Sequence, residues 1–133
     1  MQNRNSLPAT ELPELVAEAE ARIRTKYAYI SGIDELARTL GVSKHHLIRE
    51  FSLYIGVSPG KYLSETRLKN AKLLLRTGKY NLEAVADMVG FAGANYFCKV
   101  FKKAEGITPG QYIKNTAIES TPEAEQLEQI HYL

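Results

Sequence analysis

Hydrophobic residues recur along this chain at intervals of three and four residues, the spacing that places them on one face of an α-helix. Near the N-terminus this pattern forms a stripe of Leu12, Leu15, Val16, Ala19 and Ile23. The alternation of apolar and polar residues that is typical of half-buried strands does not reach strand length anywhere in the sequence. The periodicity therefore predicts an all-α fold, with a first helix over this stripe.

Capping residues and glycines indicate where the next helices begin and end. A second helix is predicted to begin near Ser31, because Ser31-x-x-Asp34 resembles a capping box, and to stop at Gly41, since glycine tolerates the left-handed conformation of a helix end. A third helix follows Ser43, whose side chain suits an N-cap. A fourth is predicted over 59–76 and ends before a further glycine.

The sequence contains an internal repeat. Segment 33–41 recurs as 82–90 at an offset of 49, and segment 51–63 recurs as 101–113 at an offset of 50, so the second copy has gained one residue just after its glycine. Two copies are too few for a solenoid, which usually needs about three or more. We therefore expect two similar subdomains, in which the fifth and sixth helices repeat the second and third. A short seventh helix is expected from Pro109.

Each copy has the layout of a helix-turn-helix unit. In the first copy, Ala37, Gly41 and Leu47 supply a small residue where the helices cross, a glycine in the turn and an apolar anchor for the second helix. In the second copy, Ala86 and Gly90 keep the first two features, and the apolar anchor comes one position later. Two such matches in one chain make the layout far more specific than a single match.

The composition excludes several classes of protein. The chain has 133 residues, of which 44% are hydrophobic and 24% are charged, as in an ordinary globular domain. No apolar run approaches the roughly 18 residues that span a bilayer, and the first residues lack the pattern of a signal peptide. We therefore expect a cytoplasmic protein without membrane contact. Cys98 is the only cysteine, which excludes an internal disulfide and a cysteine-based zinc site, and no cofactor or metal is expected.

Charge is distributed unevenly along the chain. Residues 21–115 hold 16 Lys and Arg against 7 Asp and Glu, a net charge of +9. Residues 1–20 carry a net charge of −3, and residues 116–133 carry four Glu and no Lys or Arg, a net charge of −4. A basic centre suits a polyanionic partner such as nucleic acid, although it says nothing about specificity.

A helix that enters the major groove must carry base-reading side chains opposite its apolar stripe. At about 100° per residue, this face consists of His45, Arg49 and Ser52 in the third helix and of Asn95, Lys99 and Lys102 in the sixth. Arginine can bridge guanine O6 and N7, and asparagine can bridge adenine N6 and N7. Lys44, Lys102 and Lys103 are better placed for phosphates, which position a protein on DNA without reading its sequence.

These residues also have purely structural interpretations, which stay open at this point. His45 and His46 fit plain surface positions, Arg49 and Lys99 fit solvated charges, and Asn95 fits a cap of the sixth helix.

Four other residues are expected to have structural roles. Cys98 is interpreted as an inert small residue beside the DNA, because no paired thiol or activating base accompanies it. Arg67 is expected to brace the two units through a buried hydrogen bond or ion pair. Tyr62 and Tyr112 are expected to pack against other residues.

These residues and their neighbours resemble the DNA-binding domain of the AraC/XylS transcriptional regulators of bacteria. The resemblance covers roughly residues 12–115. Its most specific block comprises Gly90-Phe91, Tyr96-Phe97, Phe101-Lys102-Lys103 and Gly106-x-Thr108-Pro109. It implies a domain of seven helices, in which a long helix joins two helix-turn-helix units and the two recognition helices enter successive major grooves.

The resemblance also implies which positions read bases. They are Lys44, His45, Ile48 and Arg49 in the first unit and Ala94, Asn95, Cys98 and Lys99 in the second. Ile48 and Ala94 depart from a polar pattern, because they can offer only contact with a thymine methyl group. Ser43, at the start of the third helix, completes the expected set of DNA-contacting residues.

We therefore expect a sequence-specific regulator of transcription that binds double-stranded DNA and is not an enzyme. The family implies that it recruits or places RNA polymerase. Many members also carry a sensor or partner domain, for which this chain has no room. The expected segments are a lead-in (1–10), a first helix-turn-helix subdomain (11–57), a linker helix (58–78), a second subdomain (79–115) and an acidic tail (116–133), in which a helix start is expected at 121–123.

Two other interpretations remain. A helical protein-interaction module would bind a partner through its acidic ends and use its basic centre only for solubility. Salt separates this interpretation from DNA binding, since phosphate contact releases counterions and makes affinity fall steeply with salt. A thiol enzyme would need Cys98 within hydrogen-bond reach of His45 or His46, and the repeat places these residues in opposite units.

Overall fold

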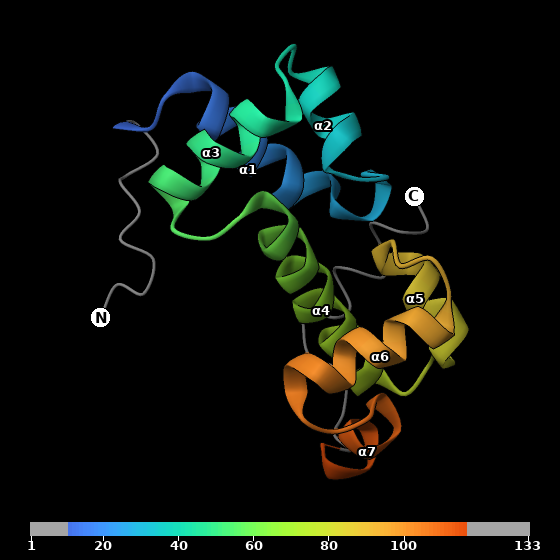
Figure 1. Ribbon diagram of the computed structural model, residues 1–133. Coiled ribbons are helices and arrows are strands. Elements are labelled where there is room, and N and C mark those ends of the chain that lie inside the picture. The colour runs from blue at the N-terminus through green and yellow to red at the C-terminus, as the bar shows by residue number, and fades with distance from the viewer. Residues whose placement is uncertain (1–10, 117–133) are drawn as a thin grey trace. The chain divides into compact units, whose positions relative to one another are not determined.

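The computed structural model describes residues 11–116, and their regular structure is entirely helical (Figure 1). In chain order the elements are α1 (Glu14–Lys26), the 3-10 helix η2 (Tyr27–Tyr29), α2 (Ile33–Thr39), α3 (Lys44–Ile55), α4 (Pro59–Thr77), α5 (Leu82–Val89), α6 (Ala94–Glu105) and α7 (Pro109–Asn115). The predicted all-α fold with seven α-helices is confirmed over this part of the chain. The expected lead-in and the helix start expected at 121–123 lie outside the described residues.

The chain divides into two compact units, with the boundary between Thr66 and Arg67. In unit 1, α3 packs against both α1 and α2, and in unit 2, α6 packs against both α5 and α7. The boundary falls inside α4, a helix of 19 residues that ends one residue later than predicted, at Thr77. Each unit therefore contains one of the two predicted helix-turn-helix pairs.

The first helix begins later than its apolar stripe indicated. Leu12 precedes the helix, and α1 begins at Glu14 with Pro13 as its N-cap residue. The reason is steric, because a proline ring disfavours helical backbone at the residue before it. The rest of the stripe behaves as predicted, and Val16, Ala19 and Ile23 are fully buried.

The predicted capping box at the start of the second helix is also wrong. The N-cap residue of α2 is Gly32, which provides no side-chain cap. Ser31 instead donates from its main-chain N–H and its hydroxyl to Oε1 of Glu35, at 2.9 and 3.0 Å. Asp34, the expected partner of Ser31, lies 3.3 Å from Nζ of Lys44 in an exposed ion pair. The glutamate one position further along the helix reaches back to Ser31 in its place.

The shared spacing of alanine and glycine in the two copies has a hydrogen-bond explanation. After α2, the N–H of Val42 donates to the carbonyl of Ala37 at 3.0 Å, and after α5, the N–H of Phe91 donates to the carbonyl of Ala86 at 2.9 Å. This bond pattern is that of a Schellman helix end, which requires a left-handed residue just past the helix. The glycines at 41 and 90 fill that place with φ values of +76° and +96°.

The core of unit 1 forms where α3 meets α1 and the start of α4. Leu47 and Phe51 on α3 are fully buried. The ring of Tyr62 packs edge-on against Phe51, with centroids 5.5 Å apart, which confirms the predicted packing role of this tyrosine. Its hydroxyl donates to Oε2 of Glu20 at 2.7 Å, so one polar contact is built into the edge of the core.

The core of unit 2 is a chain of aromatic rings. Phe97 and Phe101 are fully buried, with centroids 5.8 Å apart, and they continue to Phe91 on one side and Tyr112 on the other. Arg67 lies over the ring of Phe91 at 5.8 Å, and burial lowers the pKa of its guanidinium. The bracing of both units by Arg67 stays a prediction.

Candidate nucleic-acid interface

The sequence of α3 orients this helix so that one side is buried and the other faces solvent. Ser43 caps it, because its hydroxyl oxygen accepts from the N–H of His46 at 3.1 Å, as predicted. Leu47, Phe51 and Ile55 form its buried side. Of the predicted site residues in this helix and its cap, Ser43, Lys44, His45 and Arg49 are exposed, and Ile48 and Ser52 are half-buried.

A shallow depression lies on the solvent side of α3. It is lined by His45, Ile48, Arg49, Ser52 and Leu53. Four of these residues belong to the predicted base-reading set, and the structure brings them together. Leu53 was missed, although a leucine that breaks the polar face of an amphipathic helix is a signal that the sequence already contained. Its side chain is 69% exposed and adds apolar surface to this face.

Arg49 is held by two neighbours on its own helix. Its Nη2 donates to Nδ1 of His46 at 3.2 Å, and its Nε lies 3.5 Å from Oε2 of Glu50. Sequence reasoning placed His46 off the base-reading face and did not consider Glu50. Both contacts depend on side-chain rotamers, which helical periodicity does not predict.

The second helix of unit 2, α6, repeats this arrangement with different side chains. Phe97 and Phe101 form its buried side. Its N-cap residue is Gly93, so the alternative in which Asn95 caps the helix is wrong. Asn95 is the second residue of α6, at the place that His45 has in α3.

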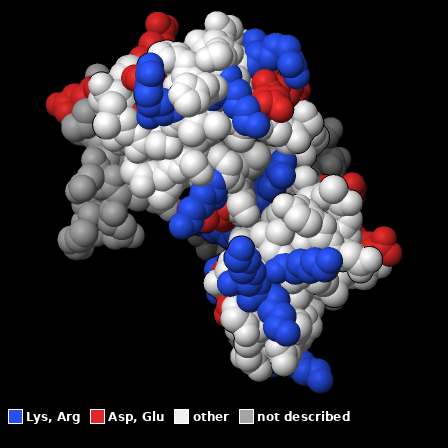
Figure 2. All heavy atoms as spheres, in the orientation of Figure 1, with Lys and Arg blue, Asp and Glu red and all other residues white. Residues whose placement is uncertain are grey.

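Figure 2 shows Lys and Arg side chains gathered where Figure 1 places α6. Of the predicted site residues in this helix, Asn95, Lys99, Lys102 and Lys103 are exposed, and Ala94 and Cys98 are half-buried. Exposed lysines beside an exposed amide combine phosphate attraction with a group that can read a base edge. The basic surface predicted for the centre of the chain is therefore present on the solvent side of this helix.

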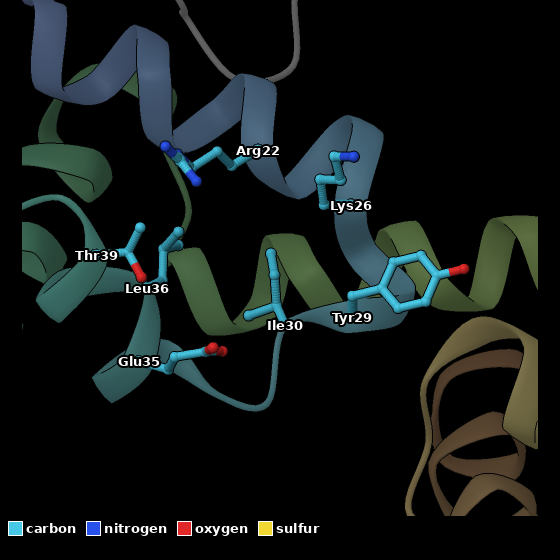
Figure 3. Close-up of a pocket in the computed structure, with 7 residues that line it drawn as sticks. All are labelled: Arg22, Lys26, Tyr29, Ile30, Glu35, Leu36 and Thr39. Atoms are coloured by element: carbon cyan, nitrogen blue, oxygen red, sulfur yellow. The ribbon is translucent and has the colours of Figure 1, made fainter.

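A second pocket in unit 1 lies between α1, η2 and α2, away from the predicted base-reading residues (Figure 3). Arg22 and Lys26 line it from α1, and Glu35 lines it from α2. The hydrogen bonds from Ser31 hold the pKa of Glu35 below its ordinary value, so this carboxylate stays ionised beside the two cations. Cations and an anion in one small pocket do not favour a polyanion, and we assign this pocket no part in DNA contact.

Comparisons with known proteins agree with this architecture. Residues 36–115 match the family model described as a helix-turn-helix domain. The C-terminal domain of AraT, a response regulator from Geobacillus stearothermophilus, superposes with a TM-score of 0.76 at 28% identity, over 82% of this chain and 91% of that one. A transcriptional regulator with an AraC-type DNA-binding domain from Chromobacterium violaceum superposes with a TM-score of 0.66 at 27% identity, over 77% and 92%.

The chain belongs to the AraC-type helix-turn-helix family. The family model covers both helix-turn-helix units, so α3 and α6 are the second helices of two DNA-binding motifs in this AraC-type domain. The resemblance seen in the sequence is thereby confirmed.

The AraC-type domain spans only part of the proteins that it resembles. An HTH-type transcriptional regulator of Haemophilus influenzae is 37% identical over 86 residues, which are 65% of this chain and 29% of that protein. The described residues contain no helix that is long and apolar enough to cross a membrane. Within the same residues, no group of three or more His, Cys, Asp and Glu is placed to hold a metal ion.

Proposed function

We propose that this chain binds double-stranded DNA at specific sequences as the DNA-binding part of a bacterial transcription regulator. In this proposal α3 and α6 are recognition helices that enter successive major grooves of a promoter. One observation carries the proposal. Both helices bury an apolar stripe and expose polar side chains at matching positions, His45 and Arg49 in one and Asn95 and Lys99 in the other.

The exposed residues divide by chemistry into base readers and phosphate contacts. Arg49 is assigned to guanine and Asn95 to adenine, because each can form two hydrogen bonds to that base. Ile48 and Ala94 can contact thymine methyl groups, while His45, Ser52, Lys99 and Cys98 complete the base-reading surface. The remaining set, assigned to phosphates, is Ser43, Lys44, Lys102 and Lys103.

The wider function follows from this proposal. A domain that binds promoters acts where bacterial DNA lies, in the cytoplasm, and we propose RNA polymerase as its protein partner there. Because the chain spans less than a third of the first relative described above, we also propose that it works with a sensor or partner domain.

The experiment is selection from a pool of randomised duplexes at two salt concentrations, followed by sequencing of the bound fraction. We expect a two-part motif with centres about 10 base pairs apart, one part for each recognition helix. Enrichment of one part only would mean that one unit reads bases and the other anchors. Weak, salt-insensitive binding without enrichment would refute the proposal and favour a protein-interaction module.

Two variants separate base reading from phosphate contact. Arg49→Ala is expected to relax the preference at one base pair of the motif. Lys102→Ala is expected to weaken binding to all sequences alike and to reduce the slope of log affinity against log salt by about one. Lys26→Ala removes the same charge from α1, outside both recognition helices, and should leave the base preferences unchanged.

A further inference from the structure

The guanidinium of Arg49 is contacted at two of its three nitrogens. Nη2 donates to Nδ1 of His46 at 3.2 Å, and Nε lies 3.5 Å from Oε2 of Glu50. Neither contact involves Nη1.

The donors that remain on the guanidinium suit a base. Arginine has five N–H donors in a rigid planar fork, and the contacts with His46 and Glu50 involve Nη2 and Nε. Both N–H groups of Nη1 and one N–H of Nη2 take no part in either contact. Two donors on the terminal nitrogens match the O6 and N7 acceptors of guanine. The contacts leave such donors available while they restrict how the group can rotate.

Restriction matters because Arg49 lies on the surface. Its side chain is 62% exposed, so packing does not hold it in one rotamer. An exposed arginine must lose rotamer freedom when it binds a base, and a side chain that is already oriented loses less. Pre-orientation also penalises wrong bases, because a guanidinium held in place cannot swing to another acceptor.

We propose that His46 and Glu50 are positioning residues that orient Arg49 toward guanine and thereby set the base preference of α3. The inference rests on the proposed function, because it assumes that α3 lies in a major groove. Arginine can only donate, so Nδ1 of His46 is the acceptor in this contact.

The repeat provides an internal comparison. Position 99 of unit 2 holds lysine, a point charge without a planar fork. The places of His46 and Glu50 are taken by Tyr96 and Val100, and valine offers no side-chain acceptor. We therefore expect a sharper preference at the base pair contacted by Arg49 than at the one contacted by Lys99.

The test is a double-mutant cycle with the full chain, bound to the selected duplex and to duplexes that carry each other base pair at the position read by Arg49. His46→Leu removes the acceptor, and we expect the preference for guanine to fall about fivefold. His46→Asn keeps an acceptor oxygen close to the position of Nδ1 and should retain most of the preference. In an Arg49→Ala background, His46→Leu should change nothing further.

The substitutions at His46 leave the helix cap in place, because Ser43 accepts from the main-chain N–H of His46 and not from its side chain. Thermal melts followed by circular dichroism check this directly. Tyr96→Phe is the matched control at the same position of the other unit, and it should leave the guanine preference intact.

The outcomes distinguish the inference from the function on which it rests. If Arg49→Ala removes the guanine preference and His46→Leu does not change it, the positioning role is overturned and the proposed function stands. If Arg49→Ala itself changes no base preference, base reading by Arg49 is overturned. Equal losses for His46→Leu and His46→Asn, or a loss in both Arg49 backgrounds, would assign His46 a separate role and overturn the inference.

Discussion

The hydroxyl of Tyr62 is one polar group whose contribution to the folding stability of unit 1 can be measured. It joins α4 to α1 through its hydrogen bond to Glu20, whose side chain is 21% exposed. Tyr62→Phe keeps the ring and removes the donor, so we expect the free energy of unfolding to fall by about 1.5–3 kcal/mol, as for hydrogen bonds to charged groups. Urea unfolding measures the change. Tyr29→Phe, on a ring that is 74% exposed, is the control, and equal stability of both variants would contradict the prediction.

Glu35 makes the stability of unit 1 depend on pH. Hydrogen bonds from Ser31 lower the pKa of its carboxyl group in the folded state relative to the unfolded chain. This contribution is complete above the unfolded pKa and is lost as the pH falls through the folded pKa. Ser31→Ala removes one of the two donors, so the pKa of Glu35 should move up toward its ordinary value while the main-chain donor keeps part of the shift. Carboxyl titration by NMR checks this, and an unchanged pKa would refute it.

The burial of single residues was predictable, whereas their rotamers were not. Helical periodicity correctly placed Leu47 and Phe97 in the two cores and His45 and Asn95 on the solvent sides. It could not predict that Arg49 turns toward His46, because residues three apart on a helix are neighbours whose contact depends on rotamer choice. The fine geometry of the candidate site therefore requires coordinates.

Two glycines at helix positions with open surroundings are expected to change the stability in opposite directions when each is replaced by alanine. Gly41 ends α2 at φ +76°, and an added Cβ would meet no atom within 4 Å, so any cost of Gly41→Ala comes from the left-handed backbone. We expect a loss of about 1–2 kcal/mol.

Gly60 lies inside α4 without a positive φ, and its added Cβ would meet only Ile33 at an ordinary 3.9 Å. Gly60→Ala should therefore stabilise the protein by up to about 1 kcal/mol, because glycine costs entropy in a helix. Thermal or urea unfolding of both variants would reveal the opposite signs. Two changes of the same sign would contradict the backbone explanation.

Helix ends were predictable where one residue decides them. Glycine conformations correctly predicted the ends of α2, α4 and α5, and the Pro109 start of α7 was predicted as well, with Thr108 and Gln111 adding a capping box. Helix starts at which several residues could form the cap were not predictable. Ser31 had two acidic residues within reach, and the structure shows that Glu35, and not Asp34, bonds to it.

At the scale of the whole molecule, the two copies agree in their interiors and differ on their surfaces. Both keep the alanine and glycine of the helix end and an aromatic residue at matching positions, Phe51 and Phe101. The exposed positions carry His45 and Arg49 in one copy and Asn95 and Lys99 in the other. Shared interiors explain why the repeat predicted the fold, and different surfaces are what two halves of a non-symmetric DNA site require.

The basic centre, residues 21–115, and the acidic C-terminal segment, residues 116–133, carry net charges of +9 and −4. If the segment competes with DNA for the basic surface, truncation after Asn115 should tighten non-specific binding about three- to tenfold at low salt, and the gain should vanish at high salt, where charges are screened. A variant with all four glutamates of the segment changed to glutamine keeps its length and should behave like the truncation. Titration of an unrelated duplex at several salt concentrations measures this. A gain on truncation alone would point to steric obstruction, and unchanged affinity in both variants would exclude the competition.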